Sequence, residues 1–335
     1  MAIANNPFSM SNMFEALQNL RFSKEISGSV PPPGFTPRAS SVVTDTRLDS
    51  LFGLMTSNEG LTQFKATISK LNRRELLVMS SLLTSDSGYF TAIVRNKNGS
   101  IRVQKLLGKS DDMDGFLCAA ILRCFLKIMT DKYASYVAVR AMLVCDNDKK
   151  KTMYELTLRY GLDIARNSHG CIAFNEVITD LDDPYYRNEL LGFVVGNAVC
   201  LSNDVSGNFV VQHVLKLNDL RCTYNVAVNL HGHCVDLSLK KYGSYIVENL
   251  LEAAEESMVV VVVELLRCDG DRLMRLARHE FGNFVVAKAL RVTKERSRVD
   301  LFLGLVHKLM PFVKLLRRSP GSNIANILDS VLVSK

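Results

Sequence analysis

The chain has 335 residues, of which 47% are hydrophobic and 22% are charged. This balance is typical of a folded protein and excludes a chain that is disordered along most of its length. The formal net charge of +7 is compatible with a nucleic-acid partner, but a charge of this size does not identify one.

The N-terminal part lacks a clear repeat. Residues 1–45 are predicted to form a disordered tail, because the prolines at 31–33 and the serines at 40 and 41 interrupt regular structure. Residues 46–96 have the apolar spacing of helices, for example at Leu61–Leu71 and Glu75–Leu83. We interpret them as degenerate or capping repeats, which the ends of a repeat array require.

From residue 97 onward a short motif recurs, most clearly at Ser206–Leu217, which reads S-G-N-F-V-V-Q-H-V-L-K-L. Each copy opens with Gly or Ala, which we call the opener. Three positions of each copy form what we call the trio. The first trio position directly follows the opener, the second comes next, and the third lies four residues after the first trio position. The first trio positions are Ser100, Ser135, Cys171, Asn208, Ser244, Asn283 and, in a weaker copy, Ser322. They are 35 to 39 residues apart, which is the period of a helical array.

The spacing within a copy predicts a helix with two different sides. Asn208 and Gln212 are four residues apart, so they stack one turn above the other, with Phe209 beside them. Val211, Val214 and Leu215 have the spacing of a buried stripe on the opposite side. We therefore expect all three trio side chains to lie together on a solvent-facing side.

The segments between the trio helices are also amphipathic. Examples are Phe116–Ile128 and Tyr186–Val199, separated by polar connections such as Cys145–Lys151. The run Met258–Val263 contains five consecutive valines and alone would indicate a strand, but its place in the repeat predicts a core helix. The expected fold is an all-α superhelix with the trio helices side by side.

Several classes of function are disfavoured. Eight cysteines without a C-x-x-C pair are typical of a reduced, intracellular protein, and H-G-H-C at His231–Cys234 has no partner pair for a metal. The histidines form no recurrent pair with Ser or Cys, and no phosphate-binding glycine loop is present. No apolar run approaches the length of a membrane span, and no secretory signal is evident. We expect no enzyme activity, no cofactor and no metal.

From about Thr84 to the C-terminus the chain resembles the Pumilio/PUF family of single-stranded RNA-binding proteins, and in particular its plant-type members. The copies G-N-F-V-V-Q-H-V-L and Y-G-S-Y-I-V-E-N-L-L carry the resemblance. It implies a right-handed superhelical solenoid of three-helix repeats over residues 46–335, with six recognisable repeats in 97–312 and a C-terminal cap in 313–335. In this family each repeat reads one base: the first and third trio residues contact the Watson–Crick edge, and the second stacks between bases.

The resemblance assigns the strongest reading residues to three consecutive repeats. These are Asn208, Phe209 and Gln212 for uracil, Ser244, Tyr245 and Glu248 for guanine, and Asn283 with Phe284 for uracil. An amide pair offers a donor and an acceptor to uracil, and a carboxylate accepts from the two N–H groups of guanine. Ala287 has lost the second edge contact of its repeat. RNA runs antiparallel to the protein in this family, so the three repeats imply a 5′-UGU core.

The upstream repeats are less complete. Ser100 with Gln104 is suited to adenine, although Ile101 is a poor stacking surface. Ser135 and Tyr136 are acceptable, but Val139 cannot bond a base. Cys171 is suited to adenine, whereas Ile172 and Asn175 are not its usual partners. We therefore expect a shorter or looser RNA site than in a member with eight complete repeats.

The leading hypothesis is a monomeric, cytoplasmic regulator that binds UGU-containing RNA, in messenger 3′ untranslated regions, and lowers translation or stability through other protein factors. A second hypothesis is a binder of structured RNA without sequence preference, as in ribosome biogenesis, with a nucleolar location. A third is a helical scaffold that binds protein only. The sequence does not give the target messengers or effector proteins.

Overall fold

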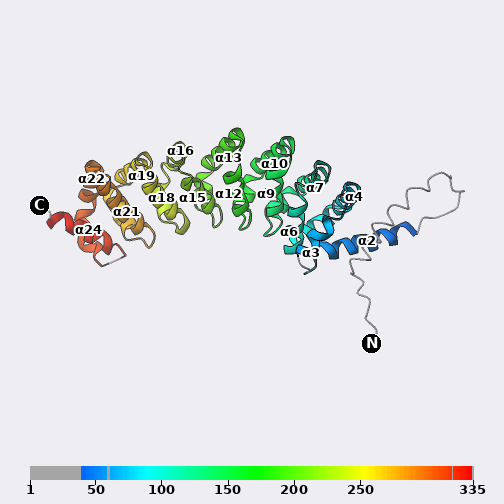
Figure 1. The fold of residues 1–335 in the computed structure, drawn as a ribbon. Helices are drawn as coiled ribbons and strands as arrows, with labels where there is room; N and C mark the ends of the chain where they lie inside the picture. The colour runs from blue at the N-terminus through cyan, green and yellow to red at the C-terminus, as the bar shows by residue number, and fades with distance from the viewer. Residues whose placement is uncertain (1–38, 59–60, 319, 334–335) are drawn as a thin grey trace, which may run out of the picture. The chain divides into compact units, whose positions relative to one another are not determined.

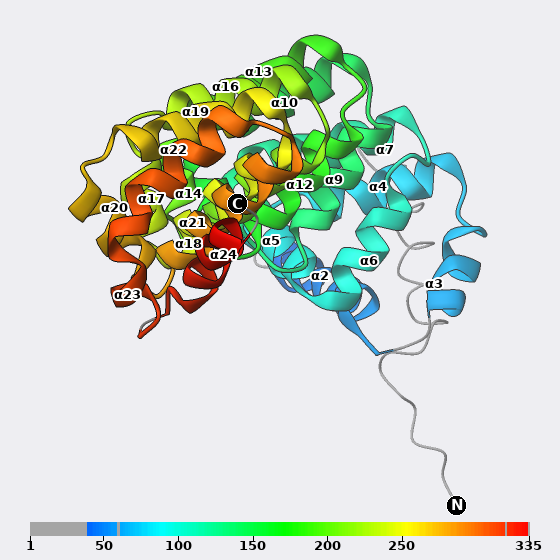
Figure 2. The ribbon, with the colours of Figure 1, turned by 90° about the vertical axis from the view of Figure 1, so that its left-hand side faces the viewer.

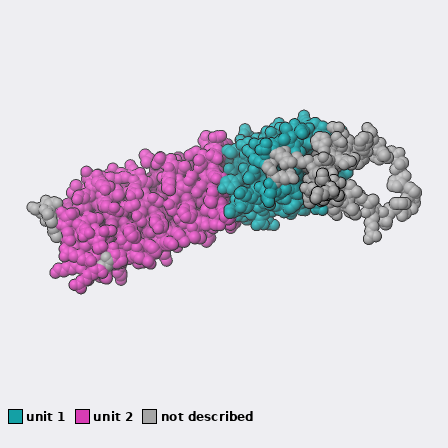
Figure 3. Space-filling view, turned by 60° about the horizontal axis from the view of Figure 1, so that its bottom comes forward, with its two compact units in different colours: residues 1–156 teal, residues 157–335 magenta. Residues whose placement is uncertain are grey.

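The computed structural model describes residues 39–58, 61–318 and 320–333. The chain divides into two compact units, residues 1–156 (unit 1) and 157–335 (unit 2), which are shown separately coloured in Figure 3. The described residues are arranged in helices and contain no strand. Most of the predicted tail lies outside the described residues.

Unit 1 is built from two layers of helices. Figure 1 shows α4 and α7 in one layer and the trio helices α6 and α9 in the other. The helices of this unit are α2 (Ala39–Thr56), α3 (Leu61–Ile68), α4 (Arg73–Leu83), α5 (Ser87–Arg95), α6 (Lys97–Leu106), α7 (Asp111–Arg123), α8 (Phe125–Met129), α9 (Ser135–Val144) and α10 (Asn147–Arg159), the last of which contains the division between the units.

Helix α2 begins earlier than the sequence indicated. It starts at Ala39, inside the stretch predicted to be tail. Pro37 stands just before it and serines occupy its first turn, and both residue types are tolerated at a helix start, so they do not break the helix. The C-terminal end of α2 is capped by α6: Arg102 Nη1 donates to the Leu54 carbonyl at 2.8 Å, and Asn98 Nδ2 donates to the Ser57 carbonyl at 3.0 Å.

Arg102 occupies a column that is apolar in the later repeats, where Val137, Val210 and Ile246 stand. Its side chain is buried, with the guanidinium over the Phe64 ring. A buried guanidinium needs hydrogen-bond partners, and the end of α2 provides carbonyl oxygens for it. Helix α2 therefore closes the N-terminal side of α6. Within residues 46–96, α5 packs against α6 as α8 packs against α9, and α4 packs against α7, so α4 and α5 complete the repeat that ends in α6.

Unit 2 repeats the same two-layer plan. Figures 1 and 2 show α13, α16, α19 and α22 following one another in one layer, and the trio helices in the other layer. The helices are α11 (Gly161–Ala165), α12 (Gly170–Asp180), α13 (Pro184–Gly196), α14 (Ala198–Ser202), α15 (Gly207–Lys216), α16 (Leu220–Leu230), α17 (Cys234–Ser238), α18 (Lys241–Ala253), α19 (Glu255–Arg267), α20 (Gly270–Ala277), α21 (Gly282–Glu295), α22 (Val299–Leu309), η1 (Met310–Phe312), α23 (Val313–Leu316) and α24 (Ser322–Val333).

The core lies between the two layers. The predicted stripe of α15 is buried, with Val211 and Val214 fully enclosed and Leu215 nearly so. The valine run is confirmed as helical, because it lies inside α19 with Val261 and Val262 buried. The short helices α14, α17 and α20 precede α15, α18 and α21 and pack against them. Each repeat is therefore an outer helix, a short helix and a trio helix.

Two expectations in unit 1 need correction. The predicted connection Cys145–Lys151 is mostly helical, since α10 begins at Asn147. The cause is Asp146, whose carboxylate accepts from the Lys149 N–H at 3.0 Å and caps the first turn. The predicted helix Phe116–Ile128 is divided at Cys124 between α7 and α8.

The cysteines of the described residues are six free thiols and one pair in contact. Cys118 on α7 and Cys145 at the end of α9 meet through their sulfur atoms. Their Cα atoms are 7.7 Å apart, beyond the range of about 4.4–6.8 Å that relaxed disulfides occupy, so this backbone fits two adjacent thiols better than a covalent bridge. In the part of the chain that the structure describes, none of the helices is long and apolar enough to cross a membrane.

Candidate nucleic-acid interface

The second trio positions of unit 2 form a row of exposed apolar side chains. Ile172, Phe209, Tyr245 and Phe284 are 49%, 55%, 51% and 53% exposed. They come from α12, α15, α18 and α21, which pack against one another in that order. Four large side chains left in solvent at one position of consecutive helices are typical of a binding surface. In unit 1, Tyr136 on α9 is also exposed, whereas Ile101 on α6 is half-buried.

The first trio positions of the six clear copies are buried, which corrects the expectation that all three side chains face solvent, whereas Ser322 of the weaker copy is exposed. They are Ser100, Ser135, Cys171, Asn208, Ser244 and Asn283, all at most 4% exposed. The reason is that each lies at the start of its trio helix, close to the loop before it. Asn208 Nδ2 donates to the carbonyls of Asp204 and Val205 at 2.8 and 3.0 Å.

Asn283 repeats this arrangement with the carbonyls of His279 and Glu280, at 2.8 and 2.9 Å. Because both amide hydrogens of each asparagine are used by the loop, the side-chain oxygen is the atom left for other contacts. Asn208 Oδ1 accepts from Gln212 Nε2 at 2.8 Å. This confirms the predicted stacking of the first and third trio positions. Ala287 offers no such donor to Asn283.

The third trio positions differ from repeat to repeat. Gln104 Nε2 donates to Ser100 Oγ at 3.0 Å, so the trio of α6 is arranged like that of α15. Glu248 instead forms an ion pair with Lys288 Nζ at 3.4 Å. Val139 and Ala287 are buried and apolar. Asn175 Nδ2 points to the Phe209 carbonyl at 3.5 Å, and its Oδ1 is buried without a hydrogen-bond partner.

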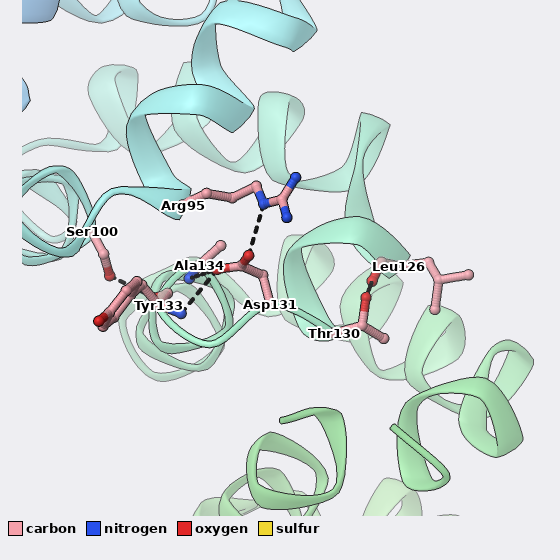
Figure 4. A network of polar contacts seen from close by, with 7 residues as sticks. All are labelled: Arg95, Ser100, Leu126, Thr130, Asp131, Tyr133 and Ala134. Atoms are coloured by element: carbon pink, nitrogen blue, oxygen red, sulfur yellow. Dashed lines mark hydrogen bonds and ion pairs between the residues drawn. The ribbon is translucent and has the colours of Figure 1, made fainter. Parts of the chain in front are cut away.

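A carboxylate or amide three residues before the opener starts the trio helix in four repeats. Figure 4 shows one of the two copies in unit 1, where Asp131 Oδ1 accepts from the amides of Tyr133 and Ala134 at 2.9 and 3.0 Å. Arg95 donates to the same carboxylate at 2.7 Å. Ser100 Oγ of the preceding repeat donates to the Tyr133 carbonyl at 2.6 Å, so the loop also ties the two repeats together.

Asp204 does the same in unit 2, with the amides of Ser206 and Gly207 at 2.9 and 2.8 Å and Arg166 at 2.9 Å. Burial alone would raise the pKa of Asp204, but the two amides and the guanidinium outweigh it and lower the pKa. Asn96 and Asn167 fill the same place with an uncharged amide. This column was not predicted, although Asp or Asn three residues before the opener is visible in the sequence.

The openers are small because they touch the preceding short helix. A Cβ on Gly170 would lie 2.4 Å from the Ile164 carbonyl oxygen, and one on Gly243 would lie 2.6 Å from the Leu237 oxygen. Such approaches are too close for an added carbon. Glycine therefore lets the trio helix pack directly on the short helix. This close packing sets the position of the trio helix, and with it the positions of the trio side chains.

The H-G-H-C run is explained by a cap. Glu264 on α19 accepts from the amides of Gly232 and Val235 at 2.7 and 3.1 Å. His231 lies beside this carboxylate, with its Nδ1 3.9 Å from Glu264 Oε2. The described residues contain no group of three or more His, Cys, Asp or Glu side chains placed to hold a metal ion.

Comparisons with known proteins agree with this architecture. The family model of the Pumilio-family RNA binding repeat matches residues 124–153, 197–219, 233–266 and 272–303. Pumilio homolog 18 of Arabidopsis thaliana is 67% identical over 330 residues, with 98% of both chains covered. The chain belongs to the Pumilio family. The members of this family are RNA-binding repeat proteins and not enzymes.

Solved structures show the same fold. The Puf4 RNA binding domain, bound to the HO endonuclease RNA 3′ UTR recognition sequence, has a TM-score of 0.73 at 18% identity, covering 97% of this chain and 98% of that one. The RNA-binding domain of yeast Puf5p, bound to MFA2 RNA, has a TM-score of 0.68 at 14% identity, covering 98% and 96%. The predicted all-α solenoid of Pumilio repeats is confirmed.

Proposed function

We propose that this Pumilio-family protein binds single-stranded RNA and recognises a UGU-containing element through α15, α18 and α21. The observation that carries the proposal is the exposed row of Phe209, Tyr245 and Phe284 beside the first and third trio residues of the same helices. Base stacking on an aromatic ring is worth about 1–3 kcal/mol per base, so three rings at one position of consecutive helices form an effective platform for three bases.

The edge groups beside these rings set the base preference. On α15, Asn208 and Gln212 are already hydrogen-bonded to each other, so an amide oxygen and an amide N–H are held in place for uracil. On α18, Glu248 presents a carboxylate, which accepts from N–H groups and rejects bases with acceptors at that place. With RNA antiparallel to the protein, α21, α18 and α15 read U, G and U.

The biological role we propose is control of messenger RNA. The Puf4 domain was solved with a 3′ UTR recognition sequence, which supports a similar class of target for this chain. The protein would act as a monomer in the cytoplasm and lower translation or messenger stability through protein co-regulators. No catalytic or cofactor chemistry is part of this role.

Binding to short RNAs that differ only in the central base tests the proposal. The expected result is tighter binding to UGU than to UAU, by about tenfold or more, because one base contact is worth about 1–3 kcal/mol of discrimination. Equal affinities would remove the claim of sequence reading. A steep loss of affinity with salt, together with equal affinities, would favour the alternative of structured-RNA binding through phosphates.

A designed exchange makes the test residue-specific. Ser244→Asn with Glu248→Gln converts the trio of α18 into that of α15 and should move the preference at the central base from guanine to uracil. Glu256→Gln is the matched control, because it removes an exposed carboxylate from α19 of the same unit. The control should keep the guanine preference.

A further inference from the structure

Lys288 lies at an unusual place on the trio face. It follows Ala287 on α21, and its Nζ reaches back to α18, where it lies 2.7 Å from Glu252 Oε1 and 3.4 Å from Glu248 Oε2. Only 18% of the Lys288 side chain and 18% of the Glu248 side chain are exposed, whereas Glu252 is 55% exposed. The Lys288 ammonium group therefore forms its closer ion pair with the exposed Glu252 and a longer one with the largely buried Glu248, which is a third trio residue.

The backward reach of Lys288 follows from the stacking of the repeats. His213 occupies the equivalent place on α15, and its Nε2 lies 2.9 Å from Thr179 Oγ1 on α12. Thr179 and Glu252 are equivalent, since each stands four residues after the third trio position of its helix. The residue after a third trio position thus contacts the preceding repeat in both pairs. In the α18–α21 pair this contact extends to the reading residue itself.

Glu248 needs this neighbour for a chemical reason. Gln212 is oriented by donating its own amide hydrogen to Asn208. A carboxylate has no hydrogen to donate, and Ser244 Oγ instead donates to the Lys241 carbonyl at 3.2 Å. A cation at the side is therefore what orients the Glu248 carboxylate, and a charge-assisted contact between two largely buried groups is stronger than one in solvent.

We propose that Lys288 is a specificity-determining residue for the central base, an inference that rests on the proposed function. When guanine donates N1–H and N2–H to Glu248, its O6 is the neighbouring atom on the same edge, on the side where an N–H of Lys288 is available. Lys288 donates to O6 and completes the reading of all three edge atoms. Adenine and cytosine carry an amino donor at the corresponding place, which faces the ammonium group unfavourably.

The test compares Lys288→Met, which keeps the length of the side chain and removes its charge, with the unaltered protein on three RNAs. These contain UGU, UAU, and UGU with 6-thioguanine as the central base, in which a weakly accepting sulfur replaces O6. Lys294→Met is the control, because Lys294 is an exposed lysine on the same helix. Lys288→Arg tests whether another cation restores the effect, and thermal unfolding checks that each variant is folded.

The expected result is a loss of about tenfold in UGU affinity for Lys288→Met with little change for UAU, since a hydrogen bond to a charged group is lost. The thio substitution should weaken binding by the unaltered protein and by Lys294→Met but not by Lys288→Met, and Lys288→Arg should recover part of the guanine preference. An equal loss on all three RNAs, or the same thio effect in Lys288→Met, overturns the inference while UGU preference in the unaltered protein upholds the proposed function. Equal binding of UGU and UAU by the unaltered protein overturns both.

Discussion

The trio helices of the two units begin in the same way but carry different side chains at the third trio position. Helix α9 in unit 1 and helix α15 in unit 2 both start from an aspartate cap and a small opener, and both expose an aromatic side chain at the second trio position. At the third position α15 has Gln212, whereas α9 has the buried Val139. The helix is thus specified by the cap, the opener and the buried stripe, and a repeat can lose its edge group without losing its fold.

The largest expected effect comes from removing the aromatic row of unit 2. Replacing Phe209, Tyr245 and Phe284 by alanine removes three stacking surfaces worth about 1–3 kcal/mol each, so RNA affinity should fall by more than about a hundredfold. The side chains are about half exposed, so the unfolding temperature should change little. Fluorescence anisotropy with a labelled UGU RNA measures the loss.

The matched variant in unit 1 is Tyr136→Ala. Tyr136 is 44% exposed, close to the values in unit 2, but its repeat lacks a third edge group. Its replacement should cost about tenfold or less, at the low end of the range of about 1–3 kcal/mol for one stacked base. A loss as large as that of the triple variant would show that unit 1 contributes as much binding as unit 2.

The next largest expected effect is the loss of stability when an opener glycine, present in both units, is replaced by alanine. A Cβ on Gly99 in unit 1 would lie 2.0 Å from the Ile93 carbonyl oxygen, and one on Gly282 in unit 2 would lie 2.6 Å from the Leu276 oxygen. Each Gly→Ala change should destabilise its unit by about 1–3 kcal/mol, because α6 or α21 must move away from its short helix. Chemical denaturation measures both changes.

Gly115→Ala and Gly192→Ala are the controls for this prediction. Both glycines are inside helices, and an added Cβ meets nothing within 4 Å. Alanine should be neutral or stabilise by about 0.5–1 kcal/mol there, because it restricts the unfolded chain. Destabilisation by the controls as large as that by Gly99→Ala would show that close packing is not the reason for the small openers.

Much of the fold and part of the candidate RNA-binding site could be predicted from the sequence, because periodic features are visible in it. The repeat length, the helical class, the buried stripe of α15 and the exposed aromatic column follow from spacing alone. The burial of Asn208 could not, since it depends on the carbonyls of the preceding loop, which only the folded turn brings within reach. The contact of Lys288 with Glu248 also escaped prediction, because it joins residues 40 apart on different helices.

A smaller effect separates the charge of the aspartate caps from their hydrogen bonds. Burial alone would raise the pKa of Asp131, but the amides of Ala134 and Tyr133 and the Arg95 guanidinium lower it below the ordinary value of 3.8. The pKa of Asp204 is lowered in the same way. A depressed pKa in the folded state stabilises the protein above the unfolded-state pKa, and this stability is lost as the pH falls through the folded-state value.

Asp131→Asn and Asp204→Asn should keep the caps, as Asn96 and Asn167 do in other repeats. At about pH 7 each should cost about 1 kcal/mol or less, since the partner arginines are more than half exposed. Below about pH 4 the double variant should lose stability less steeply than the unaltered protein. Urea denaturation across this pH range measures the slope, and parallel curves would contradict a role for the two charges.

The smallest expected effect comes from giving α9 in unit 1 the hydrogen-bonding side chain that its third trio position lacks. Val139→Gln gives α9 a glutamine at the third trio position. With Ser135 it forms the pair of edge groups suited to adenine, and Tyr136 is the stacking residue beside them. Val139 is 7% exposed, but glutamine stands at the equivalent place on α6 and α15, where Gln104 and Gln212 are half-buried, so a longer polar side chain can extend toward solvent from this place. One added hydrogen bond should raise affinity by about two- to tenfold, only for RNAs with adenine at the base facing α9.

Val139→Met is the control for side-chain size in this exchange, because it lengthens the side chain without adding a hydrogen-bonding amide. Competition binding with all four bases at the place facing α9 measures the preference. A gain with any base, shared by the methionine variant, would indicate only a larger contact surface. A gain with adenine alone, confined to the glutamine variant, would show that α9 can read a base and lacks only the edge group at its third trio position.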